Sequence, residues 1–190
     1  MLHGYKRVQT FYTLYNTGGV LSVTGDCVDM TLAEERRLRE FLAKPPILLR
    51  NLSKEELSVF MTAVTHDSYS NELDQLNASR GLVSKSESYE RLEFLGDAVL
   101  EFLVCERVFH NTEDTEGNMT LFKQDRVANA KISERVLNSG MDLDSVIRIS
   151  KGTDIVENIR ADCFEALVAA VYLTRGLDEV RRIVDDVILV

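Results

Sequence analysis

The chain has 190 residues, 45% of them hydrophobic and 28% charged, which is typical of one globular domain with a buried core. Its formal net charge of -9 excludes broad electrostatic attraction to nucleic acid or anionic lipid, so a polyanionic partner needs a local binding device. Apolar runs end before the ~18 residues of a membrane span, and no secretory signal opens the chain. We therefore expect a soluble, intracellular protein with no membrane contact; nucleus, cytoplasm and organelle all stay open.

The first 30 residues differ from the rest in being rich in β-branched and aromatic residues around the glycine pair at 18–19. This pattern favours a β-hairpin. The lack of acidic residues before Asp26, in a segment that carries Lys6 and Arg7, is equally typical of an organellar transit segment. Both interpretations stay open.

Helical spacing dominates from Thr31 onward. Thr31 is a candidate N-cap for a helix that the proline pair at 45–46 ends, with apolar residues expected on one face: Leu32, Leu38, Phe41 and Leu42. A second helix is predicted from about 54 to 65, because Ser53 and Glu56 have the spacing of a capping box. Residues 71–88 are polar and contain Gly, Asn and Ser, which predicts a loop.

The remaining elements are also helical. A helix is expected over 89–104, followed by a turn at 110–118 and by one or two helices within 119–140. We then expect a connector at 145–154 and two further helices at 156–174 and 177–189. The predicted fold is thus all-α with a small N-terminal appendage. We place the boundary at residue 50, so that 1–50 form an extension with the candidate hairpin and one helix, and 51–190 form the helical domain.

Acidic residues form a stripe on the helix that begins near Tyr89. Their spacing of i, i+3, i+7 and i+11 places them on one face: Glu90, Glu93, Asp97 and Glu101. A solvated face is the simplest interpretation. Against it, like charges at i,i+4 destabilise a helix, no Lys or Arg follows Glu93 or Asp97 at i+4, and Gly96 costs about 1 kcal/mol relative to Ala.

A second acidic pair, Asp162 and Glu165, lies on one face of the helix predicted at 156–174, among alanines that allow a close neighbour. Four converging carboxylates would raise one another's pKa unless a hard cation lay between them, and such oxygen-rich sites suit Mg²⁺. The residues therefore suggest a divalent-cation site for phosphodiester chemistry. Spacing alone is weak support, because acidic pairs at i,i+3 also arise by chance.

Several segments in the same order resemble the ribonuclease III family. "ERLEFLGDAVL" is similar to the family signature, "ADCFEALVAAVYL" resembles its second acidic motif, and "AVTHDSYSNE" resembles the segment before the signature. "EGNMTLFKQDRVAN" resembles the intervening stretch, which ends in a recurrent asparagine, here Asn129. The resemblance covers roughly residues 57–187.

The resemblance implies an all-α endonuclease domain that cleaves both strands of double-stranded RNA, leaving 5′-phosphate and 3′-hydroxyl ends with short 3′ overhangs. It assigns four residues as catalytic residues and as ligands of Mg²⁺, for which Mn²⁺ can substitute: Glu93, Asp97, Asp162 and Glu165. The alternative is a non-cleaving scaffold or RNA-binding subunit of a larger particle or heterodimer. The four intact acids favour the enzyme.

Neighbouring residues have less defined roles. Glu90 is expected behind the metal ligands or against a partner, and Lys131, with Lys123 and Arg126, is a candidate RNA contact. Asn129 either orients a phosphate or water, or caps local backbone. We expect Glu101 to be solvated, His66 to be a hydrogen-bonded scaffold residue rather than a base, and Arg160 to contact phosphate or form an ion pair.

Phe94 matches a family aromatic that fills a cavity on the partner subunit, so the resemblance implies a homodimer, with an ordinary core phenylalanine as the alternative. We expect no double-stranded-RNA-binding domain after the helical domain, and we identify no family resemblance in the segment before Leu57. Affinity for RNA would then come from the N-terminal segment, from an accessory domain or from a partner protein. The sequence leaves open the natural RNA and the choice between homodimer and heterodimer.

Overall fold

The structure is a computed structural model that describes residues 31–83 and 85–190; the predicted hairpin or transit segment lies outside them. The described elements are α2 (Leu32–Leu42), α3 (Lys54–Ala63), α4 (Asp67–Ser79), α5 (Glu90–Asn111), α6 (Glu116–Val127), α7 (Asn129–Asn138), the 3₁₀ helix η1 (Leu143–Ser145), α8 (Glu157–Arg175) and α9 (Leu177–Val187). An isolated parallel bridge joins Thr65 to Arg148. The predicted all-α fold is confirmed for this part of the chain.

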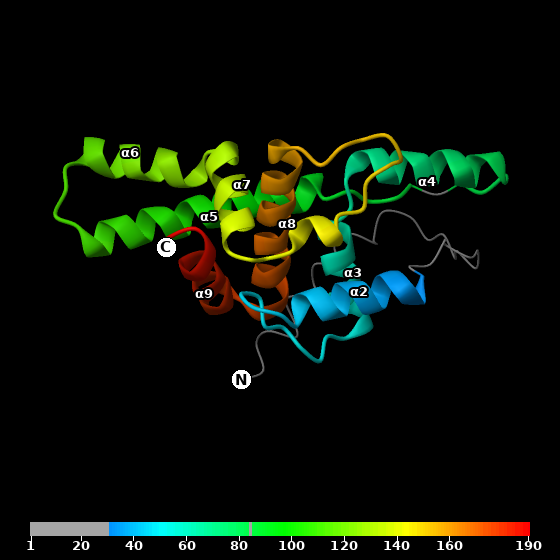
Figure 1. Ribbon diagram of the computed structural model, residues 1–190, viewed down its shortest axis with the longest axis horizontal. Helices are drawn as coiled ribbons and strands as arrows, with labels where there is room; N and C mark the ends of the chain where they lie inside the picture. The colour runs from blue at the N-terminus through cyan, green and yellow to red at the C-terminus, as the bar shows by residue number, and fades with distance from the viewer. Residues whose placement is uncertain (1–30, 84) are drawn as a thin grey trace.

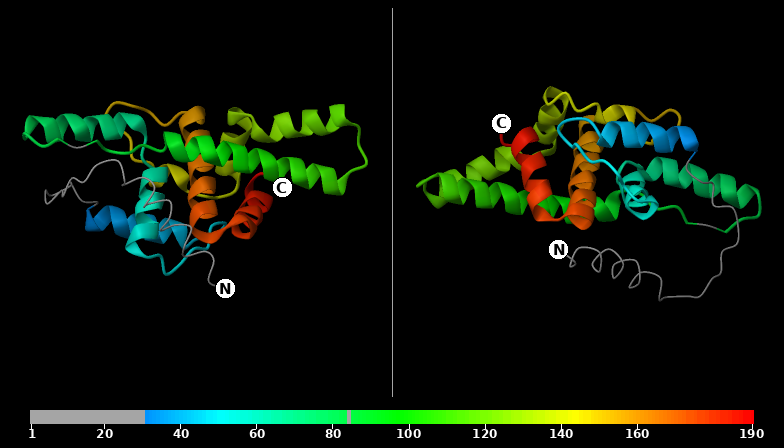
Figure 2. Two further views of the ribbon diagram at one scale, coloured as in Figure 1. Left: turned by 180° about the vertical axis from the view of Figure 1, so that it is seen from behind. Right: turned by 90° about the horizontal axis from the view of Figure 1, so that it is seen from below.

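Helix α8 is the centre of the domain. It is buried along most of its length, and α3, α5, α7 and α9 pack around it, with the largest contact made by α5 (Figure 1). Beyond this body, the α5–α6 pair extends to one side and α4 to the other (Figures 1 and 2). The crossing of α5 and α8 is therefore the place where acids on the two helices can meet.

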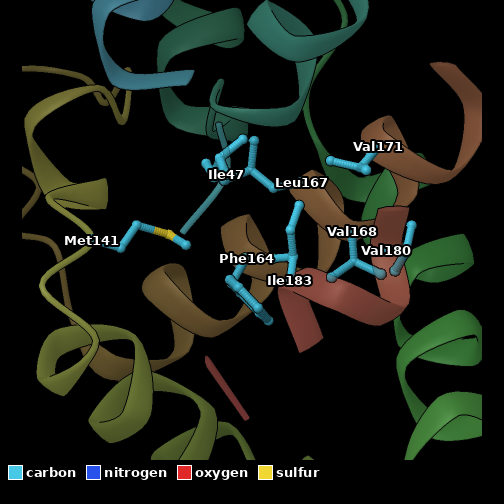
Figure 3. A pocket seen from close by; sticks show the side chains of 8 residues that line it. All are labelled: Ile47, Met141, Phe164, Leu167, Val168, Val171, Val180 and Ile183. Carbon is cyan, nitrogen blue, oxygen red and sulfur yellow. The ribbon is translucent and has the colours of Figure 1, made fainter. Parts of the chain in front are cut away.

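The core beside α8 and α9 is tightly filled. An apolar cavity in this region has a volume of about 10 Å³. The side chains that line it are shown in Figure 3: Ile47, Met141, Phe164, Leu167, Val168, Val171, Val180 and Ile183. Such a volume is at the lower limit for one water molecule, and an apolar lining offers that water no hydrogen bond. This cavity is a packing defect with no room for a ligand.

The predicted N-cap at Thr31 and the predicted capping box at Ser53 are both present, and Thr31 also belongs to a capping box. Thr31 and Glu34 cap α2, and Ser53 and Glu56 cap α3, each pair exchanging side-chain-to-backbone hydrogen bonds. Three of the four apolar residues expected on one face of α2 are buried in the same core as α3 and α8, namely Leu38, Phe41 and Leu42. Leu32, the first residue of the helix, is 86% exposed and lies outside this core. The boundary at residue 50 stays a prediction.

The loop predicted over residues 71–88 is wrong for its first half, because α4 continues to Ser79. Its N-cap is His66, whose Nδ1 accepts a hydrogen bond from the Ser68 N–H (3.1 Å). Little of α4 is buried, so the apolar periodicity that reveals a core-facing helix is absent from its sequence. A local cap and exposed polar residues support this helix instead.

The segment predicted as one or two helices over 119–140 forms parts of two. Extended backbone at Ala128 (φ -68°, ψ 132°) separates α6 from α7 and makes Asn129 the first residue of α7. The last two helices were predicted within one or two residues of their observed bounds. Gly176, with a φ of 89°, allows the sharp change of direction between them. Among the described residues, no helix is both long and apolar enough to cross a membrane.

Gly96 explains how α5 approaches α8 so closely. A Cβ atom at this position would lie 1.8 Å from the backbone carbonyl oxygen of Glu165. The sequence shows only the cost of a glycine inside a helix, whereas the structure shows that the absence of a side chain allows backbone-to-backbone contact. This contact brings the acidic stripe of α5 next to the second acidic pair.

We expect Gly96→Ala to destabilise the protein by about 3 kcal/mol, because the added methyl group meets backbone that cannot rotate away. The melting temperature should fall by roughly 6–12 °C. Gly117→Ala in α6 is the matched control, since a Cβ there meets nothing within 4 Å, and it should be neutral or slightly stabilising. An unchanged melting temperature for Gly96→Ala, measured by circular dichroism, would contradict the observed helix crossing.

Candidate metal centre

The predicted acids meet where α5 crosses α8. Glu93, Asp162 and Glu165 each place one carboxylate oxygen within 4.8 Å of the others, an arrangement that could hold a metal ion. Asp97, one turn beyond Glu93, is exposed and lies outside this group of three. Its charge nevertheless raises the pKa of both Glu165 and Glu93, so it lies at the edge of the cluster.

Burial and mutual repulsion hold protons on this cluster. Burial raises the pKa of Glu165 to about 8, and the charges of its three acidic neighbours add to the effect. Burial, followed by the charges of Asp162, Glu90 and Asp97, raises the pKa of Glu93 to about 7. The pKa of Asp162 is also raised by burial. Burial and the neighbouring acids act in the same direction on Glu93 and Glu165, and a bound cation would oppose their effect.

These shifts predict how stability depends on pH in the metal-free protein. Because the folded-state pKa of Glu165 lies above the ordinary glutamate value of about 4.3, its stabilising contribution is complete below that value and is lost as pH rises through about 8. Allowing for solvent screening, we expect a loss of about 2 kcal/mol between pH 5.5 and 8.5, or roughly 4–8 °C in melting temperature.

Thermal melts in EDTA across this pH range measure the loss, and Mn²⁺ or Mg²⁺ should reverse it, because a bound cation favours the ionised acids. Glu165→Gln should show a much smaller fall. A metal-free melting temperature that does not change over this range would contradict the predicted cluster.

One further side chain hydrogen-bonds the cluster, and a second is influenced by its charge. Asn129 donates a hydrogen bond from Nδ2 to Asp162 Oδ1 (3.1 Å), while Ala128 occupies the N-cap position, so the cap interpretation of Asn129 is not observed. Tyr89, which the sequence interpretation missed, is buried, and burial followed by the negative charge of Asp162 raises the pKa of its phenol. A tyrosine just ahead of a helix carries no pattern that separates this position from an ordinary core residue.

The His66 ring packs edge to face against the Tyr89 ring, with centroids 5.5 Å apart. The His66 Nδ1 atom accepts from the Ser68 amide and therefore points along α4. The Asp67 carboxylate is 2.9 Å from the same nitrogen. Because that nitrogen accepts a hydrogen bond from the Ser68 amide, it carries no proton that it could donate to Asp67. These contacts agree with the scaffold interpretation.

Residues predicted around the site are mostly engaged elsewhere. Glu90 is exposed and accepts from the Ser88 hydroxyl (3.2 Å). The expectation that Glu101 is simply solvated was wrong, since its carboxylate pairs with Lys123 Nζ (2.5 Å). The other predicted cations also form ion pairs, Arg126 with Asp125, Lys131 with Glu134 and Arg160 with Asp144.

Phe94 points to solvent with 82% of its area exposed. The alternative of an ordinary core phenylalanine is therefore wrong. The two other phenylalanines of α5 are exposed as well, Phe102 at 51% and Phe109 at 68%. An apolar surface of this kind on one helix is characteristic of a protein–protein contact.

Fold and site together define a class of protein: an all-α domain that gathers carboxylates from two crossing helices into a group able to hold a metal ion. Residues 56–190 match the family described as Ribonuclease-III-like. The chain belongs to this family, and the predicted resemblance is confirmed.

Individual relatives agree with this assignment. Ribonuclease 3 of Caldanaerobacter subterraneus subsp. tengcongensis is 33% identical over 144 residues, which cover 72% of this chain and 58% of that protein. Ribonuclease 3 of Clostridium beijerinckii is 36% identical over 141 residues, covering 67% of this chain and 56% of that protein. The chain thus spans less than two thirds of the length of these relatives.

Solved structures show the same fold. The nuclease domain of ribonuclease III from Campylobacter jejuni has a TM-score of 0.61 at 26% identity, over 84% of this chain and 95% of that chain. A second structure of that domain, described for flexibility in a region involved in dimer formation, has a TM-score of 0.60 at 24% identity, over 81% of this chain and 98% of that one.

Proposed function

We propose that this chain is the nuclease domain of an endoribonuclease that cleaves double-stranded RNA to products with 5′-phosphate and 3′-hydroxyl ends and short 3′ overhangs. The observation that carries the proposal is the cluster of Glu93, Asp162 and Glu165 at the helix crossing, with Asp97 at its edge. Its presence in a chain of the Ribonuclease-III-like family supports this chemistry.

The donor set fits a hard divalent cation. Every candidate ligand atom is a carboxylate oxygen, and the raised pKa values of Glu93 and Glu165 reflect repulsion that a cation would relieve. Glu93, Asp162 and Glu165 would hold the ion, and exposed Asp97 would face it from the open side. When bound there, Mg²⁺ or Mn²⁺ supplies Lewis acidity, which makes water more acidic and stabilises negative charge on the phosphate.

The protein's own groups provide the geometry for this reaction. Glu165 is only 5% exposed and belongs to the core helix α8, so the surrounding core restrains its carboxylate. Asp97, in contrast, lies on the surface, where an RNA duplex can approach. Asn129 holds one oxygen of Asp162. Burial on one side and exposure on the other orient the acids toward a substrate that arrives from solvent.

A homodimer is the assembly we propose, with Phe94 inserted into the partner subunit. The support is the exposed apolar surface of α5 and the description of the related Campylobacter jejuni domain as having a region involved in dimer formation. A two-fold dimer carries two acidic clusters, which suits the cleavage of two strands.

The cations near α6 and α7 form ion pairs with neighbouring acids. We therefore propose that an accessory RNA-binding domain or protein supplies most of the affinity for RNA.

Purified protein incubated with a long, end-labelled RNA duplex tests the activity. We expect cutting in Mg²⁺ and Mn²⁺, no cutting in EDTA, and cleavage at least ~100-fold slower in Ca²⁺, whose larger and more flexible coordination shell positions water less well. Gel shift should show duplex binding in Ca²⁺. Equal rates in Ca²⁺ and Mg²⁺ would contradict the mechanism, and binding without cleavage in any metal would favour the scaffold alternative.

A further inference from the structure

Arg160, near the start of α8, joins three elements through its guanidinium group. Its Nε and Nη2 atoms donate to the two carboxylate oxygens of Asp144 in η1 (2.7 and 2.6 Å). Its Nη1 atom donates to the Ser133 hydroxyl of α7 (2.8 Å). Ser133 is buried, and the Arg160 side chain is only 11% exposed. Because a guanidinium is a rigid planar fork of donors, it can satisfy both partners only when α7, η1 and α8 keep one relative position.

The partner of Arg160 on α7 shares a helix face with Asn129. Positions 129 and 133 are four residues apart, so they lie one turn from each other on one side of α7. Asn129 donates from Nδ2 to Asp162 Oδ1 (3.1 Å), and Asp162 follows Arg160 by two residues on α8. One hydrogen bond therefore runs from α7 to α8 and one from α8 to α7, both beside the acidic cluster.

The first turn of α7 has no side-chain cap of its own. Its N-cap residue is Ala128, which has no polar group to offer the backbone. Ile132 and Val136 bury the other side of the helix in the core. Such apolar contacts are non-directional, so they oppose separation of α7 from α8 more than they oppose small sliding or rotation. A directed hydrogen bond to Ser133 supplies that missing restraint.

We propose that Arg160 is a positioning residue for the metal cluster. By holding Ser133, it keeps α7 in the register at which Asn129 donates to Asp162. Groups that lie behind metal ligands commonly change metal affinity by about 10–100-fold. This role rests on the proposed function only in that the cluster binds a divalent cation.

Ser133→Ala tests the role with the smallest change, because it removes the contact with α7 and leaves the ion pair with Asp144. Mn²⁺ binding to the RNA-free protein is followed by the electron paramagnetic resonance of free Mn²⁺. The affinity should fall about 10-fold in Asn129→Ala and in Arg160→Met, and at least roughly threefold in Ser133→Ala. In the Asn129→Ala background neither second change should weaken it further, because Arg160 and Ser133 act through Asn129.

Arg175→Met is the matched control, since it removes an arginine at the other end of α8 that pairs with Glu56 of α3. It should lower the melting temperature but leave Mn²⁺ affinity within twofold, which separates positioning from a general loss of stability.

Wild-type Mn²⁺ affinity in Ser133→Ala would overturn the proposal, as would losses that add to that of Asn129→Ala. If Arg160→Met loses the native far-ultraviolet spectrum, Ser133→Ala decides alone. Wild-type protein that binds Mn²⁺ but leaves duplex RNA uncut would contradict the proposed function alone, because the Mn²⁺ comparison needs no RNA.

Discussion

Glu165→Gln should reduce duplex cleavage at least roughly 1,000-fold, as expected when one member of a catalytic group that acts as a unit is removed. The glutamine has almost the same volume but no negative charge, so the cluster loses a cation ligand while the fold is kept. At pH 8 the metal-free variant should melt above wild type, by about 4–8 °C, because a buried and repelled carboxylate is gone. Activity and stability therefore change in opposite directions.

Single-turnover cleavage, gel shift in Ca²⁺ and thermal melts measure these three properties on one preparation. Glu113→Gln provides the same chemical change at an exposed position after the far end of α5 and should leave all three near wild type. Cleavage by Glu165→Gln within tenfold of wild type would remove this residue from the metal ligands. A lower melting temperature at pH 8 would indicate that its charge is already balanced.

Phe94→Ala should weaken dimerisation with little effect on the folded subunit. The side chain is 82% exposed in the single chain, so its truncation leaves no cavity there. If the ring fills a partner cavity, its loss costs about 3–5 kcal/mol, which raises the dimer dissociation constant by at least ~100-fold. Double-strand cutting needs two acidic clusters, so cutting by the variant should decline on dilution as the dimer dissociates. Glu93, the residue before Phe94, would be disturbed as well.

Analytical ultracentrifugation and product sizing on one duplex test this prediction. Leu32→Ala is the control, because Leu32 is an equally exposed apolar residue on α2, and it should dimerise like wild type. A wild-type monomer that still releases duplex products with overhangs would refute the dimer. A large fall in the melting temperature of a monomeric Phe94→Ala would instead show that the ring supports its own subunit.

The helices and their ends were largely predictable from the sequence. Thr31 with Glu34, and Ser53 with Glu56, satisfy backbone donors within one turn, so each signal is complete in a few residues. The helix α4 was predicted as a loop because the prediction depends on local patterns. A polar helix that buries few residues shows no periodic apolar pattern. The family resemblance was predictable for a similar reason, since each of its motifs is a short run of neighbouring residues and the motifs follow one another in a fixed order.

The sequence by itself determined which acids share a helix face, since positions three, four and seven apart lie on one side of a helix whatever surrounds it. Only the tertiary structure decided that Glu93, Asp162 and Glu165 form the close group, that Asp97 lies at its edge and that Glu101 pairs with Lys123 instead. Distances between helices depend on packing, here on a glycine at 96 that allows backbone contact with Glu165, and burial depends on every element that covers α8. Both are properties of residues distant in sequence, which local patterns do not contain.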